Sequence, residues 1–319
     1  MTTKGSRDRN RACALGLGLA VALAVAPLAY AANAAPASSP AAAPAAALHR
    51  THLSIGLIPE LNIFKQKTRF ILLGEYLARK IGVPVKFTIL SRYGNILDSF
   101  EADRMDGAFF GSFTGALAIE RLGVIPLARP VNLDGTSTYH GYLFVRKDSG
   151  LHDAAAMRGK RMAYVDRATT AGYLFPLAWL RARGISPAGY FGETWFTGSH
   201  DAAMTAVLDR TADVGAAKHS VYDRVRKENP RIDRELIILA SSPPVPSNGL
   251  CVRRDLPEDL REALRRALLD LERDPAGAEV LKQFGALRFI ETTARDYAPV
   301  LDMAGKAGID LKRYQYRNE

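Results

Sequence analysis

Short apolar segments with the character of strands alternate with amphipathic segments with the character of helices along most of this 319-residue chain. In the first half, the expected strands are 53–58, 85–90, 107–110 and 124–128, and the expected helices are 70–81, 93–100 and 115–122. Such alternation is typical of parallel strands joined by helical crossovers. It restricts the chain to an α/β fold.

The alternation restarts after an expected strand at 142–145. The second series has strands at 162–165, 190–191 and 214–217, helices from 173 and at 202–208, a proline-rich connector at 241–246, and helices at 257–271 and 276–284. We therefore expect two α/β lobes, with 51–141 and 246–319 in lobe 1 and 142–245 in lobe 2. Two crossover segments would join the lobes, and a ligand cleft would lie between them.

Residues 1–35 have the three parts of a secretory signal peptide: a basic head, an apolar run at 12–28 and small residues suited to cleavage. A membrane anchor is the alternative, but a run of roughly 17 Ala-rich residues is short for spanning a bilayer. Residues 36–50 are dominated by Ala, Pro and Ser, which predicts a disordered linker. We expect a soluble protein exported to the periplasm.

The formal charge of +10 becomes +7 without the four basic residues and one aspartate of the signal. The basic residues are spread out, with no basic run containing aromatic residues, so nucleic acid is not an expected partner. The mild positive field of the protein would instead help to attract small anions. Cys251 is the one cysteine outside the signal, which excludes an internal disulfide in the mature chain. Cys13 lacks the lipobox motif that precedes a lipid-modified cysteine.

A strand at 161–165 leads directly into a turn with Thr169, Thr170, Ala171 and Gly172. Pro176 fits only the first turn of a helix, so the helix should begin near Ala171 or Gly172 and leave both threonines in the turn. The first N–H groups of a helix lack intrahelical acceptors and attract anions. Ordinary N-capping by threonine is the alternative interpretation.

Other polar residues stand at comparable boundaries between elements. Ser112 begins one expected helix, and His200 follows Gly198 and Ser199 at another. A lone histidine is more often a structural group, and His219, just after the strand at 214–217, has less support than His200. The further candidates are Tyr93, Tyr139, Phe110 and Glu60.

Each of these candidates also has an ordinary interpretation. The aromatic residues could be core side chains, although a tyrosine hydroxyl can donate to a bound anion. Glu60 could be a solvated loop charge, or it could reject a fully ionised anion or pair with an amino substituent.

Signatures of catalysis are missing from the sequence. It has no Gly-x-Ser-x-Gly elbow, no His-Glu-x-x-His and no phosphate loop, and its six histidines lack metal-ligand spacing. We therefore expect binding without turnover, and no cofactor or metal. An exported enzyme with His200 as general base is the least favoured hypothesis.

From Leu53 to about Leu301 the sequence resembles the periplasmic substrate-binding proteins of phosphate, phosphite and phosphonate ABC importers. The segments that carry this resemblance are 103–111, 139–141, 145–149, 166–173 with Pro176, 197–200, 213–216 and 242–246. The resemblance implies a type II periplasmic-binding fold that closes over a phosphorus oxyanion. It also implies an ABC permease in the inner membrane as partner, or, alternatively, a sensing role toward a membrane histidine kinase.

The family's ligand-binding residues can be matched to positions in this chain. Thr169 and Thr170 match its Ser-Thr pair, His200 its histidine, and Tyr93 and Tyr139 its tyrosines. Phe110 replaces a tyrosine and Ala171 replaces a serine, so two hydroxyl donors are missing, while His219 falls near an acidic position of some members. The resemblance therefore implies the class of ligand, a phosphorus oxyanion, but does not identify the individual compound.

Overall fold

The computed structural model describes residues 51–60 and 63–318. The expected signal peptide at 1–35 and linker at 36–50 lie outside these residues. No described helix combines the length and the apolar character needed to cross a membrane.

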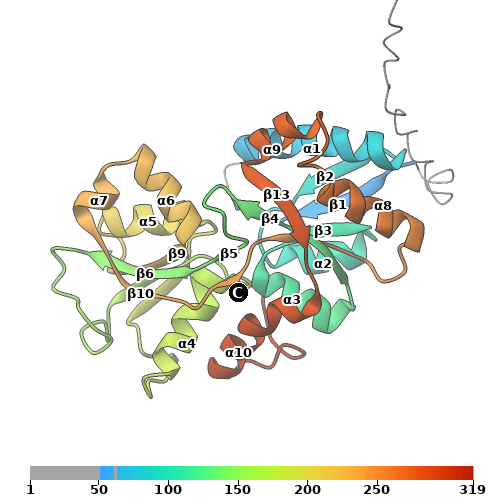
Figure 1. The fold of residues 1–319 in the computed structure, drawn as a ribbon. Coiled ribbons are helices and arrows are strands. Elements are labelled where there is room, and N and C mark those ends of the chain that lie inside the picture. The colour runs from blue at the N-terminus through green and yellow to red at the C-terminus, as the bar shows by residue number, and fades with distance from the viewer. Residues whose placement is uncertain (1–50, 61–62, 319) are drawn as a thin grey trace, which may run out of the picture. The chain divides into compact units, whose positions relative to one another are not determined.

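The first sheet has six strands in the order β13-β4-β12-β3-β1-β2 (Figure 1). Its bounds are β1 Leu53–Leu57, β2 Val85–Ile89, β3 Gly107–Phe110, β4 Ile125–Asn132, β12 Gly249–Val252 and β13 Ala286–Glu291. Strand β1 runs parallel to β2 and β3, as the alternation predicts. Strand β12 runs antiparallel to β3 and β4, and β13 antiparallel to β4, so the sheet is mixed.

The second sheet has five strands in the order β10-β6-β9-β7-β8. Its bounds are β6 Gly141–Arg146, β7 Arg161–Tyr164, β8 Glu193–Phe196, β9 Val214–Lys218 and β10 Leu236–Ser241. Strand β7 is parallel to β8 and β9, whereas β6 is antiparallel to β9 and β10. The expected strand at 190–191 is wrong, because Tyr190 and Phe191 form a turn whose rings pack edge to face, and β8 begins two residues later.

Helices cover both faces of each sheet (Figure 1). Helices α1 Ile63–Ile81, α8 Glu258–Leu269 and α9 Gly277–Phe284 share one face of the first sheet, and α2 Asn95–Ala102 and α3 Ser112–Leu122 the other. On the second sheet, α5 His200–Leu208, α6 His219–Glu228 and α7 Arg231–Glu235 share one face, and α4 Phe175–Arg181 the other. One buried apolar cluster extends from the α2–α3 side of the first sheet to the α4 side of the second, so the two sheets share a core.

Two short strands carry the chain between the sheets. Strand β5 Thr138–Tyr139 pairs antiparallel with β11 Val245–Pro246. Beside this pair, the Gly141 amide donates to Ser242 Oγ at 2.8 Å, and the Ser242 amide donates to the Gly141 carbonyl at 2.9 Å. The two passages are therefore joined to each other as well as to their sheets.

The C-terminal segment contacts parts of the chain that lie far apart in the sequence. Helix α10 Ala298–Lys306 follows a short 3-10 turn, Ala294–Tyr297, and packs against α3 and α4. Beyond it, the Tyr314 hydroxyl donates to the Arg167 carbonyl at 2.9 Å, and Tyr316 and Arg317 bind the Asp98 carboxylate. Residues 311–318 thus bind both helix α2 and the turn that follows β7.

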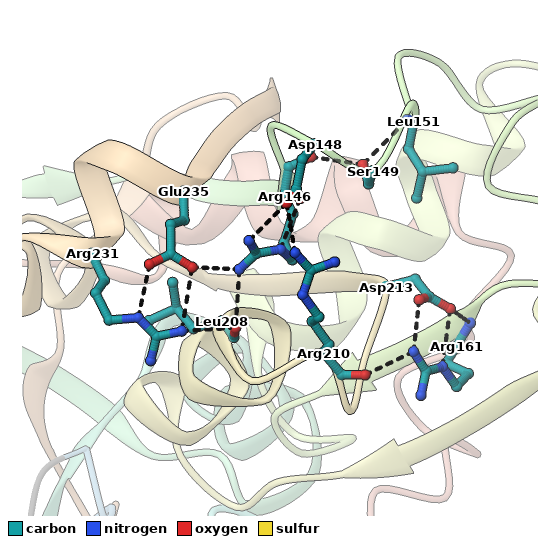
Figure 2. Close-up of polar contacts among 10 residues, drawn as sticks. All are labelled: Arg146, Asp148, Ser149, Leu151, Arg161, Leu208, Arg210, Asp213, Arg231 and Glu235. Atoms are coloured by element: carbon teal, nitrogen blue, oxygen red, sulfur yellow. Dashed lines mark hydrogen bonds and ion pairs between the residues drawn. The ribbon is translucent and has the colours of Figure 1, made fainter.

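A charged network fixes one end of the second sheet (Figure 2). At the end of β6, Arg146 donates to Glu235 at 2.6 Å and to Asp148 at 2.8 Å. Glu235 also accepts from Arg231 at 2.8 Å, and both arginines donate to the Leu208 carbonyl at 3.0 Å. The network therefore joins β6 to the ends of α5 and α7.

We expect Glu235→Gln to lower the melting temperature by about 2 °C at pH 7, because it removes the charge that both arginines bind. Arg231 and Arg146 lower the pKa of Glu235 to about 2. A carboxyl group with a lowered folded-state pKa stabilises the fold fully above its unfolded value, near 4.5, and loses that contribution as the pH falls toward 2. Calorimetric scans should show the wild-type advantage shrinking over that range.

Glu258→Gln is the matched control, since that side chain is 82% exposed and lies 3.5 Å from one arginine. An equal effect from both substitutions would contradict a specific role for the network.

Candidate functional site

A hollow of about 10 Å³, about the space of one water molecule, is lined by residues that follow strands of the first sheet, by residues of the second sheet and its turns, and by residues of the passages between the sheets. Eight of the ten residues singled out from the sequence line it: Glu60, Tyr93, Ser112, Tyr139, Thr169, Thr170, Ala171 and His200. Strand ends and helix starts supply most of them, as expected for a ligand site in an α/β protein.

Three hydroxyl groups from distant segments meet at this hollow. Ser112 Oγ lies 2.9 Å from Thr170 Oγ1 and also hydrogen-bonds the Tyr139 hydroxyl. Ser112 is the first residue of α3, which Gly111 separates from the end of β3, and Tyr139 lies on β5. Burial raises the pKa of Tyr139 to about 12, so its proton stays in place to be donated.

The turn after β7 presents its threonines in two different ways. Thr169 has extended backbone and donates its hydroxyl to the Asp166 carbonyl at 2.6 Å. Thr170 opens a π-helical turn, Thr170–Leu174, that continues into α4, so it belongs to the first helical turn and not to the loop before it. Of the two, Thr170 has its hydroxyl bonded across the hollow, to Ser112.

Tyr93 brings an unpartnered hydroxyl to the hollow. Its side chain is buried, at 3% exposure, and its hydroxyl has no hydrogen-bond partner among the described residues. Burial raises its pKa well above the usual value, so the group remains a neutral donor. A buried polar group without a partner costs free energy, and a ligand in the hollow would satisfy it.

His200 is held as a neutral donor. The Lys218 amide donates to His200 Nδ1 at 3.2 Å, so the ring's own proton lies on Nε2. Burial and then the charge of Lys218 lower the pKa of His200 to about 4. At neutral pH the imidazole can therefore offer one N–H without adding a positive charge.

An ion pair closes one side of the hollow. Lys218 Nζ lies 2.7 Å from Glu60 Oε1, 3.4 Å from Asn248 Oδ1 and 4.5 Å from the centre of the Tyr139 ring. Burial alone would raise the pKa of Glu60, but Lys218 and Arg69 outweigh it and lower the pKa to about 2. Glu60 is therefore a paired carboxylate, which corrects its interpretation as a solvated loop charge.

Phe110 and His219 are not brought to the hollow. Phe110 is fully buried on β3, where its ring packs against Phe100 of α2, so it is a core residue. His219 begins α6 and accepts the His140 amide proton through Nδ1 at 3.0 Å. It lines a larger neighbouring cavity instead.

Two polar residues of the hollow, Lys218 and Asn248, were missed by the sequence reasoning. Lys218 ends the correctly predicted strand β9, and the end of such a strand is where a site residue is expected in this class of fold. Asn248 follows the proline-rich connector and carries no comparable signal. Groups of three or more His, Cys, Asp or Glu able to hold a metal ion are absent from the described residues.

The chain is similar to known proteins in both sequence and structure. The sequence model of one family, described as the periplasmic substrate-binding protein of phosphonate ABC transporters, matches residues 55–297. A phosphonates-binding periplasmic protein of Escherichia coli is 24% identical over 259 residues, 79% of this chain and 75% of that protein. A probable ABC transporter phosphite binding protein, PhnD1 of Prochlorococcus marinus, is 24% identical over 264 residues, 80% of this chain and 89% of that protein.

The structure of P. marinus PhnD1 in complex with methylphosphonate superposes with a TM-score of 0.71 at 23% identity and covers 81% of this chain and 98% of that one. This likeness confirms the expected α/β fold of the two-lobed periplasmic-binding type.

We expect Gly172→Ala to lower the free energy of unfolding by about 1–3 kcal/mol, because the new methyl group would lie 2.4 Å from Val165 Cβ and 2.9 Å from Thr169 Oγ1. Gly305→Ala is the control, since its methyl group would meet nothing within 4 Å and alanine favours the helix. Urea unfolding measures both. Equal stability of the two variants would show that the turn tolerates a side chain at 172.

We also expect ¹⁵N NMR to find His200 neutral and protonated on Nε2 at pH 7, with a titration midpoint near 4. Because the folded-state pKa is below the unfolded value of about 6.5, the neutral ring's contribution to stability is present above that value and is lost as the pH falls toward 4. A midpoint near 6.5 would contradict the burial of this ring.

Proposed function

The chain belongs to the family of periplasmic substrate-binding proteins of phosphonate ABC transporters, and from that premise we propose that it captures a phosphonate, phosphite or related phosphorus oxyanion in the hollow. The unpartnered Tyr93 hydroxyl is the observation that carries this proposal. It is a buried donor at a position where an anion would accept its hydrogen bond.

The remaining donors support the same ligand. Ser112, Tyr139 and Thr170 offer hydroxyl protons, and His200 offers Nε2–H. An oxyanion would replace the bonds that the three hydroxyls make with one another by charge-assisted bonds, which are stronger than neutral ones. Lys218 and Arg69 both pair with the Glu60 carboxylate. Lys218 therefore lies at the edge of the hollow as a positive charge near the proposed ligand.

Capture requires the two lobes to move. The lobes we propose are 51–141 with 246–319, and 142–245, hinged at the paired passages β5 and β11. Ser112 belongs to the first and Thr170 to the second, so separating the lobes would break their hydrogen bond and admit a ligand too large for the present hollow. Each lobe would then hold part of the ligand, and the ligand would favour closure.

We propose that the protein delivers this ligand to an inner-membrane ABC permease, after export to the periplasm by the signal peptide at 1–35. A role in binding without turnover fits a hollow that offers hydrogen-bond donors and an ion pair but no activated nucleophile.

We expect Tyr93→Phe to weaken the binding of methylphosphonate by about tenfold or more, because a hydrogen bond to a charged ligand contributes about 1.5–3 kcal/mol. The substitution should leave the free protein's stability unchanged or slightly higher, since the lost hydroxyl has no partner there. Isothermal titration calorimetry measures the affinity.

Tyr190→Phe is the matched control. The Tyr190 hydroxyl is equally buried and unpartnered among the described residues, but it does not line the hollow. Unchanged affinity in Tyr93→Phe, or equal losses in both variants, would reject the proposed site.

A further inference from the structure

A larger cavity, of about 460 Å³, adjoins the hollow. Ile58, Glu60, Lys218 and Asn248 line both spaces, so the Lys218–Glu60 ion pair lies at their junction. The larger cavity extends from there along α1, the end of β4 and the first turns of α6. Its volume suits a ligand substituent of several heavy atoms.

Basic residues outnumber acidic residues in this cavity. Its cationic lining residues are Arg69, Lys218, Arg224 and Lys227, and its acidic ones are Glu60, Asp134 and Asp223.

Each of the acidic residues is already engaged. Glu60 binds Lys218, Asp134 accepts from Thr136 and faces His219, and Asp223 lies 3.5 Å from Arg226.

Two of the basic residues lack such partners. Arg224 and Lys227 lie one helical turn apart on α6, and neither has an ion pair or hydrogen bond with another described residue through its side chain. The pKa of Arg69 is lowered, by burial and by the nearby positive charge of Arg224, although the charge of Glu60 opposes this shift. Arg69 and Arg224 therefore lie close enough to repel each other on this wall. Arg224 is half-buried and Lys227 is exposed, so this wall carries two positive charges that no described carboxylate pairs with, and these charges would attract an anionic group.

The junction disfavours a cationic substituent for the same reason. Glu60 is the carboxylate nearest the hollow, and both Lys218 and Arg69 neutralise it. An ammonium group near Glu60 would also meet the positive charges of Lys218 and Arg69, which oppose its binding.

We propose that the larger cavity is the site for the substituent of the ligand, and that it selects phosphorus compounds whose substituent ends in a carboxylate or another acidic group. Arg224 and Lys227 are the residues that would recognise this second charge. The inference rests on the proposed function, since the phosphorus oxyanion would occupy the hollow.

Isothermal titration calorimetry with three classes of ligand tests it. The first class is phosphonoacetate, 3-phosphonopropionate and 4-phosphonobutyrate, the second their neutral amides of equal length, and the third 2-aminoethylphosphonate, with methylphosphonate as reference. We expect at least one carboxylate to bind about tenfold more tightly than its amide, and 2-aminoethylphosphonate to bind more weakly than methylphosphonate. The advantage of the carboxylate should shrink in 0.5 M salt.

The double variant Arg224→Ala, Lys227→Ala should abolish the preference for the carboxylate and leave methylphosphonate affinity within about twofold of wild type. Arg273→Ala with Lys306→Ala removes the same charge from exposed positions outside the cavity, and it should keep the preference.

The outcomes separate the two proposals. If methylphosphonate binds but carboxylates and amides bind equally, or if the double variant keeps the preference, the substituent site is wrong and the oxyanion site stands. If no phosphorus oxyanion binds the wild-type protein, both proposals fall.

Discussion

The pairing of β5 with β11 is the constraint on which the rest of this structure depends. The first sheet is built from segments on both sides of these passages, because β12 and β13 return to it after β10 has completed the second sheet, whose strands all lie between β5 and β11. Strand β5 also carries Tyr139, which bonds Ser112, while the chain just beyond β11 carries Asn248. The passages that connect the sheets therefore also supply part of the lining of the hollow.

The electrostatics of the hollow follow from this arrangement. Lys218 lies at the end of β9 and Glu60 just beyond β1, so their ion pair joins residues of the two sheets. Buried ion pairs must offset the cost of removing both charges from water, and they are weak grounds for stability alone. In this protein the pair allows the Glu60 carboxylate to lie beside the proposed anion site, because the positive charge of Lys218 balances its negative charge.

The sequence was sufficient to predict what depends on local pattern. The strand–turn–helix at 161–180 and the helix starts at Ser112 and His200 are local features, and eight of ten candidate residues do line one hollow. Helix α1 begins seven residues before the expected position, and Phe64 in its first turn is 77% exposed, so that apolar side chain does not mark the buried face of the helix. Antiparallel pairing of β12 and β13 is non-local and leaves no periodic signal. For Phe110 the sequence left a core and a site interpretation open, because an aromatic residue at a strand end fits both, and the structure places it in the core.

The C-terminal residues 311–318 bind the turn after β7 through Arg167 and Asp166, and helices α2 and α3 through Asp98 and Arg121. That turn is the one that continues into Thr169 and Thr170. In the proposed opening, parting Ser112 from Thr170 would also stretch or break the hydrogen bonds of residues 311–318 on one side. Removing residues 311–318 should therefore make the proposed opening easier without changing any residue that lines the hollow.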